Sequence, residues 1–104
     1  MSKVVNVSSK EELDEVLEMN PRVLVDFSKS VGCVWCKKLE PHFDAASNLA
    51  PQTAFVKVDV LDAPELIEEY GFMKVPTVLL FEHGEKVAEV QARTALQIVS
   101  EIKR

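Results

Sequence analysis

The chain has 104 residues, of which 47% are hydrophobic and 28% are charged, as is usual for a globular protein, and we expect one domain over residues 1–104. Its 12 basic and 17 acidic residues leave a net charge of −5, which argues against nucleic acid or an anionic membrane as a partner, because both bind clustered Lys and Arg. No apolar stretch approaches the ~20 residues of a membrane span, and the first residues lack the apolar core of a signal peptide, so we expect a cytoplasmic protein.

The first part of the chain predicts a strand, a helix and a second strand. Residues 4–7 are rich in valine and indicate a short strand. Ser9 can cap a helix, with Glu12 completing a capping box, and Pro21 ends that helix because proline disfavours helix in the residue before it. Residues 22–28 follow as an apolar, β-branched run that is typical of a buried strand.

A longer helix is predicted over residues 34–48. Pro41 lies inside it, where the missing N–H removes one hydrogen bond and should bend the axis. Four apolar residues fall on one stripe at helical spacing, the last of them one residue past this range: Leu39, Phe43, Ala46 and Leu49.

The rest of the chain predicts five further elements, namely a strand over residues 54–60, a short helix over 63–70, strands over 77–81 and 86–91, and a last helix over 94–102. Gly71 should end the short helix, and His83-Gly84 should form the tight turn between the last two strands. The last helix should bury four apolar side chains: Leu96, Ile98, Val99 and Ile102. The order βαβαβαββα predicts an α/β fold, with a mixed central sheet and helices on both faces.

Both cysteines lie at the junction between the second strand and the long helix. Cys33 and Cys36 are three residues apart, so one helical turn would bring their sulfurs within disulfide reach. A metal site is disfavoured, because zinc needs about four ligands and only His42 and His83 could add to the pair. We therefore interpret the pair as a redox-active dithiol that needs no cofactor or metal.

The predicted positions favour reactivity at this junction. A helix N-terminus stabilises a thiolate, which should lower the pKa of Cys33, whereas Cys36 should be more buried and less reactive. Asp26 interrupts the apolar second strand, and burial should raise the pKa of its carboxyl group toward neutrality. An acid of this kind is suited to proton exchange near pH 7.

These motifs together resemble the thioredoxin family over nearly the whole chain. The matching segments are Val25-Asp26-Phe27, Cys33-x-x-Cys36, Pro41, Lys57, Tyr70-Gly71, Val75-Pro76-Thr77 and the turn from Phe81 to Glu85. The resemblance implies the thioredoxin fold and thiol–disulfide exchange, with Cys33 as the nucleophile and Cys36 as the resolving thiol. It also implies protein disulfides as substrates and a monomer that a thioredoxin-reductase-like or glutathione-based donor recharges.

The resemblance also implies roles for residues around the cysteines. Asp26 would exchange a proton with Cys36, with Lys57 as its charge partner. Pro76 would be a cis-proline facing the disulfide, and Val75 would offer backbone hydrogen bonds to an extended substrate. Trp35 has two interpretations that do not depend on the resemblance: it packs on the surface, or, as an exposed aromatic residue beside the nucleophile, it contacts a partner.

The chain departs from the family's usual Trp-Cys-Gly-Pro-Cys sequence. Gly32 precedes Cys33, Ser28 replaces another customary tryptophan, and Trp35 takes the place of the proline. Because Trp35 keeps its backbone N–H, we expect that donor to point toward the Cys33 sulfur. Together with positive charge from Lys74, it should stabilise the thiolate and make the couple more oxidising than that of a Gly-Pro thioredoxin.

A further departure lies after the last strand, where Ala92 and Arg93 stand near the position of the family's glycine and should alter the substrate groove.

Two other functions stay open. The chain could be a thioredoxin-fold adaptor whose partner contacts matter more than turnover, although the presence of both cysteines, Asp26 and Pro76 favours the enzyme. It could also be a glutathione-dependent, glutaredoxin-like reductase. Against that stands the predicted strand and helix over residues 4–19, which glutaredoxins generally lack.

Overall fold

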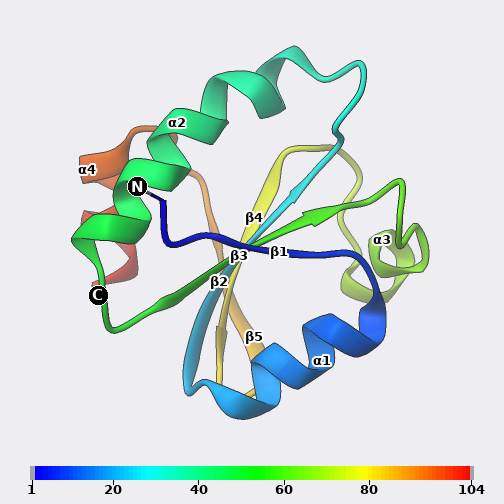
Figure 1. Cartoon of the computed structure of the whole chain (residues 1–104), viewed down its shortest axis with the longest axis horizontal. Helices are drawn as coiled ribbons and strands as arrows, with labels where there is room; N and C mark the ends of the chain where they lie inside the picture. Colours follow the sequence, from blue (N-terminus) through cyan, green and yellow to red (C-terminus); the bar gives the residue numbers. More distant parts are fainter. Residues whose placement is uncertain (1, 104) are drawn as a thin grey trace.

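The computed structural model describes residues 2–103, in which a five-stranded sheet lies between two layers of helices (Figure 1). The elements are β1 (Val5–Val7), α1 (Lys10–Met19), β2 (Arg22–Ser28), α2 (Val34–Leu49), β3 (Ala54–Asp59), α3 (Glu65–Tyr70), β4 (Thr77–Glu82), β5 (Glu85–Val90) and α4 (Ala95–Ile102). The order confirms the α/β arrangement predicted from the sequence. Within residues 2–103, no helix has both the length and the apolar character needed to cross a bilayer.

The sheet has the strand order β1-β3-β2-β4-β5, so β2 lies at its centre. β1 and β2 both pair in parallel with β3, whereas β4 is antiparallel to β2 and β5 is antiparallel to β4. The sheet is therefore mixed, as expected. The loop before β4 and the loop after β2 meet at one end of the sheet, since antiparallel neighbours run in opposite directions.

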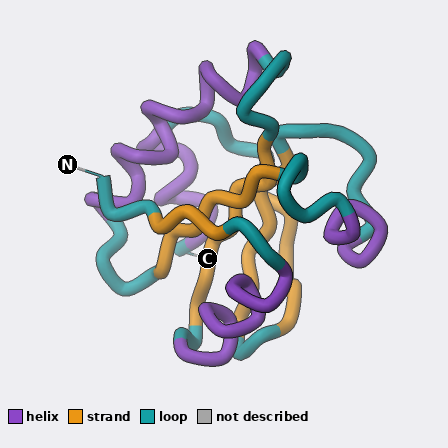
Figure 2. Tube along the Cα trace, turned by 45° about the vertical axis from the view of Figure 1, so that its right-hand side comes forward, coloured by secondary structure: helices purple, strands orange, loops and turns teal. Residues whose placement is uncertain are grey.

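Alternation along β2 divides its side chains between two hydrophobic cores. Val23, Val25 and Phe27 belong to the core that α1 and α3 cover, and Leu24 belongs to the core that α2 and α4 cover. Figure 2 shows the sheet strands running between these helices. The same alternation directs Asp26 toward α2, the helix that begins with the cysteine pair.

Local capping starts α1 as expected, with one difference. The Ser9 hydroxyl accepts a hydrogen bond from the Glu12 N–H at 3.1 Å. The Glu12 carboxylate, however, accepts from the N–H of Ser8 at 2.9 Å, so the reciprocal bond reaches one residue further than in a regular capping box. Hydrogen bonds from the Ser8 backbone and hydroxyl lower the pKa of Glu12.

Left-handed residues reverse the chain at the predicted positions. Gly71 ends α3 with φ of 70°, and its N–H bonds to the Ile67 carbonyl. His83 and Gly84, at φ of 52° and 84°, connect β4 to β5. Positive φ at both central residues is the requirement of a type I′ hairpin turn, which matches the twist of the two strands.

Two apolar side chains expected on packed helix faces are exposed instead. Leu96 is 75% exposed on α4, because it lies about 200° around the helix from Ile98, which is fully buried. Leu49 is 52% exposed because it is the last residue of α2, past the packed stripe of Leu39, Phe43 and Ala46. The prediction was therefore wrong for Leu96 and Leu49 and correct for the other members of each set.

The contrast on α4 gives a stability test. Ile98→Ala should lower the free energy of unfolding by about 2–5 kcal/mol, because it leaves a cavity between α4 and the sheet. Leu96→Ala should change it by no more than about 0.5 kcal/mol, because the side chain is exposed. Urea unfolding of the oxidised protein measures both values, and similar losses for the two variants would contradict this placement of α4.

Candidate active site

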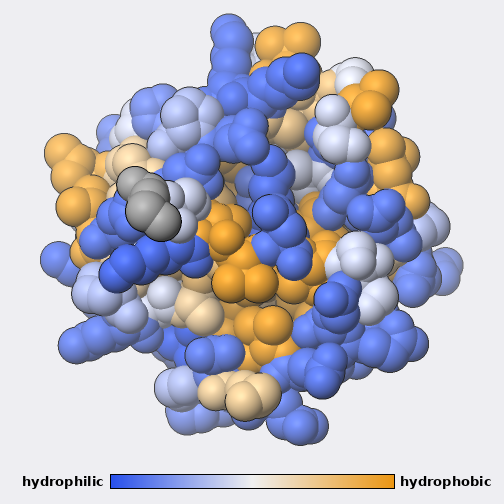
Figure 3. Space-filling model, viewed as in Figure 1, coloured by the Kyte–Doolittle hydropathy of each residue, from blue (hydrophilic) through white to orange (hydrophobic). Residues whose placement is uncertain are grey.

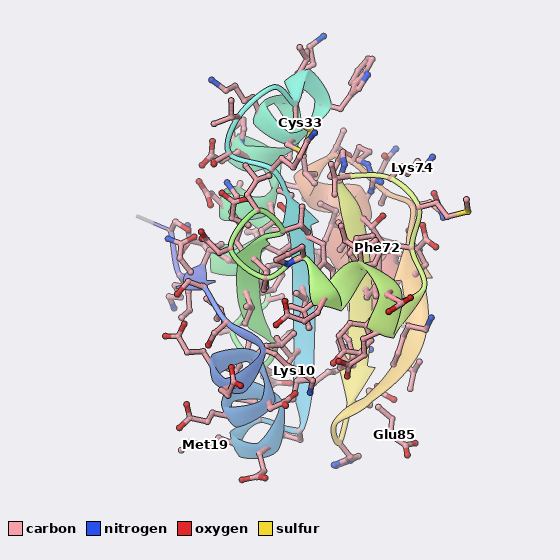
Figure 4. The ribbon with its side chains drawn as sticks, turned by 90° about the vertical axis from the view of Figure 1, so that its right-hand side faces the viewer. Lys10, Met19, Cys33, Phe72, Lys74 and Glu85 are labelled. Carbon is pink, nitrogen blue, oxygen red and sulfur yellow. A yellow bond between two sulfur atoms is a disulfide. The ribbon has the colours of Figure 1, made fainter. Side chains whose placement is uncertain are left out.

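A disulfide joins Cys33 and Cys36 at the start of α2, with their Cα atoms 5.3 Å apart. Cys33 is the N-cap residue, with extended backbone, and its sulfur accepts a hydrogen bond from the Cys36 N–H at 3.2 Å. The first amides of a helix have no partner within the helix, so this bond satisfies one of them. Figure 4 shows Cys33 at one end of the molecule, at the beginning of α2.

The two sulfurs differ in exposure. Cys33 is half-buried, whereas Cys36 is only 3% exposed and its sulfur lies 3.5 Å from the N–H of Lys29. An external disulfide can therefore approach Cys33 more easily than Cys36. This is the arrangement that an attacking thiol and a resolving thiol require.

The segment before the disulfide is open to solvent. Gly32 has φ of 73°, which explains why a glycine stands where the family usually has tryptophan. Val31 and Val34 are both exposed. Figure 3 shows hydrophobic side chains along the upper edge of the molecule, where this segment lies in Figure 1.

The Trp35 N–H does not play the part expected of it. Among the described residues, the backbone donor to the Cys33 sulfur is the N–H of Cys36, one position further along. An N-cap side chain can accept from the second or the third amide of a helix, and in α2 it is the third, that of Cys36. A proline at position 35 would leave the same bond in place. Trp35 in place of proline therefore adds no hydrogen bond that would stabilise the Cys33 thiolate.

Asp26 is fully buried beneath α2. Burial raises the pKa of its carboxyl group to about 6, against opposing effects of a hydrogen bond from Ser28 and the positive charges of Lys57 and Arg93. Negative charge at Glu40 adds to the rise. The Ser28 hydroxyl donates to one carboxylate oxygen at 2.6 Å, and the other oxygen has no partner among the described residues.

Lys57 acts on Asp26 through space and not through a contact ion pair. Its ammonium group bonds to the Glu40 carboxylate at 3.0 Å, across from β3 to α2. Lys57 and Asp26 are register partners on adjacent parallel strands, which keeps the charge close to the acid. The role as charge partner of Asp26 is thus electrostatic only.

The loop before β4 lies against the disulfide. The Val75–Pro76 peptide bond is cis, as the resemblance implied, and the Cys33 sulfur is 3.9 Å from the Val75 carbonyl oxygen. The Thr77 hydroxyl donates to the Lys74 carbonyl at 2.5 Å and holds this loop in place. Figure 4 shows Lys74 in the same loop, at the same end of the molecule as Cys33.

The structure brings the expected substrate-binding residues together in one groove. The residues that line this groove include all four of them: Trp35, Lys74, Val75 and Pro76. Trp35 is 67% exposed, and the Lys38 ammonium lies 4.8 Å from its ring centroid. Among residues 2–103, no group of three or more metal-ligating side chains is placed to hold an ion.

Sequence reasoning missed two contributors. Ser28 was read only as a departure from the family, although it lies two residues from Asp26 on the same strand face and could have been paired with it by alternation. Arg93 was named only as a change near the groove. Its guanidinium in fact donates to the Val90 and Ala92 carbonyls, and to the Pro76 carbonyl at 3.5 Å.

Comparisons with known proteins agree with this geometry. The family model described as Thioredoxin matches residues 3–104. Thioredoxin-1 of Schizosaccharomyces pombe is 31% identical over 100 residues, which cover 96% of each chain. Thioredoxin-2 of Pyricularia oryzae is 37% identical over 87 residues, which make up 84% of this chain, although the match spans only 50% of the longer relative.

A solved structure of Plasmodium falciparum thioredoxin shares the fold, with a TM-score of 0.85 at 26% identity, and the match covers 95% of this chain and 96% of that one. Residues 3–104, which the family model matches, contain the sheet, the helices on both of its faces and the Cys33–Cys36 disulfide. The chain belongs to the thioredoxin family, and its disulfide-bonded cysteine pair supports the thiol–disulfide oxidoreductase function of that family.

Proposed function

We propose that Cys33 is the nucleophile and Cys36 the resolving thiol of a protein-disulfide reductase. The Cys33 thiolate attacks one sulfur of a substrate disulfide, so that a mixed disulfide forms and the other substrate sulfur leaves as a thiolate. Cys36 then attacks the Cys33 sulfur, which releases the second substrate thiol and forms the Cys33–Cys36 disulfide. Two electrons thereby pass to the substrate. The observation that carries this proposal is a half-buried N-cap sulfur bonded to a buried sulfur one helical turn away.

Asp26 is proposed to accept the proton of Cys36 during the second step and to return it in the reverse reaction. A carboxyl group with a pKa of about 6 can exchange protons near neutral pH, which an acid of ordinary pKa does poorly. Lys57 would limit the rise in the pKa of Asp26 through its charge. Both residues then act on the thiol chemistry from beneath α2.

The groove beside Cys33 is proposed to bind an extended, disulfide-bearing segment of a protein. Val75 would offer its backbone to that segment, and Trp35 would contact it from the other side of the disulfide. We further propose that the protein acts in the cytoplasm as a monomer, with residues 1–104 forming one domain. A thioredoxin-reductase-like or glutathione-based donor would recharge it, since the reaction leaves the cysteine pair oxidised.

The resolving role of Cys36 predicts a trapped intermediate. Cys36→Ser should leave the first attack intact and block the second, so mixed disulfides between Cys33 and substrate proteins should accumulate. Non-reducing electrophoresis of the variant, followed by mass spectrometry after reduction, measures them. The Cys33→Ser, Cys36→Ser double variant is the control and should trap nothing. Partners that bind the double variant equally well would favour an adaptor and contradict the enzyme.

The buried acid predicts a pH-dependent stability. The pKa of Asp26 is about 6 in the folded protein and 3.8 in the reference state, so between these values the folded state binds more protons than the unfolded state. The protonated form of Asp26 therefore stabilises the folded state relative to the ionised form. This contribution to the free energy of unfolding is fully present below pH 3.8 and is lost as the pH rises through 6. Asp26→Asn should therefore gain stability over the original protein as the pH rises, by up to about 3 kcal/mol.

Urea unfolding of both oxidised proteins between pH 3 and pH 8 measures this difference. Ser28→Ala keeps the acid but removes the hydrogen bond to its carboxylate, which should raise the pKa of Asp26 in the folded protein further. In that variant the pH range over which stability falls should therefore extend to higher pH. A difference between the Asp26→Asn variant and the original protein that stays constant over the range would contradict the raised pKa.

We also propose that the reduction potential of the Cys33–Cys36 couple is higher, and so more oxidising, than the value of about −270 mV for thioredoxin. Lys74 and the N-terminus of α2 favour the Cys33 thiolate, and stabilising the reduced form by about 1.4 kcal/mol raises the potential by about 30 mV. Equilibration with glutathione buffers, followed by counting of alkylated thiols, yields the potential. A value at or below about −270 mV would contradict the proposal.

A further inference from the structure

The groove beside the disulfide is built from three separate parts of the chain. It has a volume of about 400 Å³ and is lined by the first turns of α2, the loop before β4 and the loop after β5. Cys33 lies at its edge, 3.9 Å from the carbonyl oxygen of Val75, a lining residue. Whatever occupies the groove therefore lies next to the reacting sulfur.

All the charged residues that line this groove are basic. Lys38, Lys74 and Arg93 contribute positive charge, and His42 adds an imidazole, while no Asp or Glu is among the described lining residues. The chain as a whole carries 17 acidic and 12 basic residues, so this grouping runs against its composition. The groove is a local positive region on a negatively charged protein.

These cations form no ion pair with an acidic side chain of the described residues, although the charge of Arg93 acts on the buried Asp26. The ion pairs of the described residues involve Lys10, Arg22 and Lys57, and none of them reaches the groove. Arg93 is held by backbone carbonyls, including that of Pro76, which fix the guanidinium without cancelling its charge. Unpaired cations fixed beside a binding groove favour an occupant that brings carboxylates.

Apart from Thr94, the other residues that line the groove are largely apolar. Leu39, Val75 and Pro76 line it, with the exposed Trp35 ring at the α2 side and Lys38 above that ring. Met73, which is 96% exposed, extends this surface along the loop before β4. An occupant therefore needs apolar side chains as well as negative charge, which a peptide segment can combine.

We propose that the groove selects disulfide-bearing polypeptide segments with Asp or Glu beside the cystine. Resting on the oxidoreductase function proposed above, this names the substrate class of the same site. The carboxylates of the segment bind at Lys74, Lys38 and Arg93, and this places one substrate sulfur against Cys33. The exchange then runs as described, with no further reactant.

Peptide substrates of matched design test the proposal. Three disulfide-looped peptides differ only at the positions that flank the cystine, which are Glu, Gln or Lys, and stopped-flow mixing with the reduced protein gives the second-order rate constant for each. The fluorescence of Trp35, the chain's one tryptophan, reports the reaction. We expect the Glu peptide to react about tenfold faster than the Lys peptide, since two or three part-exposed ion pairs together contribute an effect of this order.

Charge reversal in the groove should abolish this preference. The Lys38→Glu, Lys74→Glu variant should favour the Lys peptide. The ratio between peptides within one variant is unaffected by any change in the reactivity of Cys33. Lys103→Glu is the control, because Lys103 lines a different cavity with Leu49 and Ala50, at the far end of α2. That control should keep the original preference.

The outcomes separate this proposal from the one on which it depends. Equal rates for the Glu and Lys peptides in the original protein, or an equal loss of preference in the Lys103→Glu control, would overturn the selectivity while leaving the oxidoreductase intact. Failure to reduce even the Gln peptide would overturn the oxidoreductase itself. If the groove variant slows only the reaction with oxidised glutathione and leaves the peptide ratio unchanged, the occupant is glutathione and not an acidic protein segment.

Discussion

The hydrogen bond from the Cys36 N–H to the Cys33 sulfur determines how this site is built. It caps α2 and positions the reactive sulfur at the same time, so the helix could not begin elsewhere without moving that sulfur. Serine or aspartate would cap the helix at least as well. Cysteine at this position is therefore explained by its chemistry. The cap needs only the backbone N–H of residue 36, so the second cysteine is explained by the disulfide that its own sulfur forms with Cys33.

Burial of the Asp26 carboxyl group costs folding free energy that the fold itself does not require. Its position in the centre of the sheet is surrounded by apolar strands, and only one of its carboxylate oxygens has a partner among the described residues. A buried charge with so little compensation opposes folding near neutral pH. An apolar residue would pack there more favourably. This unfavourable position is what the proposed proton transfer would require, and the hydrogen bond from Ser28 limits how far the pKa of Asp26 rises.

Local patterns were sufficient to predict the order of elements, the turns and the position of the cysteine pair, because each depends on neighbours in sequence. Gly71 and His83-Gly84 are such cases, and their backbone angles agree with the prediction. Leu96 was misplaced because a run of apolar residues was counted without its rotation around the helix. The ion pair of Lys57 with Glu40 joins β3 to α2, and no local pattern specifies which acid a lysine reaches across a core.

In the basic groove, the charges that would bind an acidic substrate lie beside the reactive Cys33 sulfur, so substrate binding and thiolate reactivity depend on the same residues. In the reduced protein, the proposed stabilisation of the Cys33 thiolate by Lys74 would leave that cation only partly available to an arriving carboxylate. When the mixed disulfide forms, the negative charge leaves Cys33 with the departing substrate sulfur, and the cations can then bind the carboxylates of the attached segment more fully. The cations would therefore hold an acidic segment most strongly in the intermediate. Two thiolates can break the mixed disulfide: Cys36, which completes the transfer of both electrons, or the second substrate sulfur, which reverses the first step. By holding the carboxylates, the groove would keep the segment in place while Cys36 attacks.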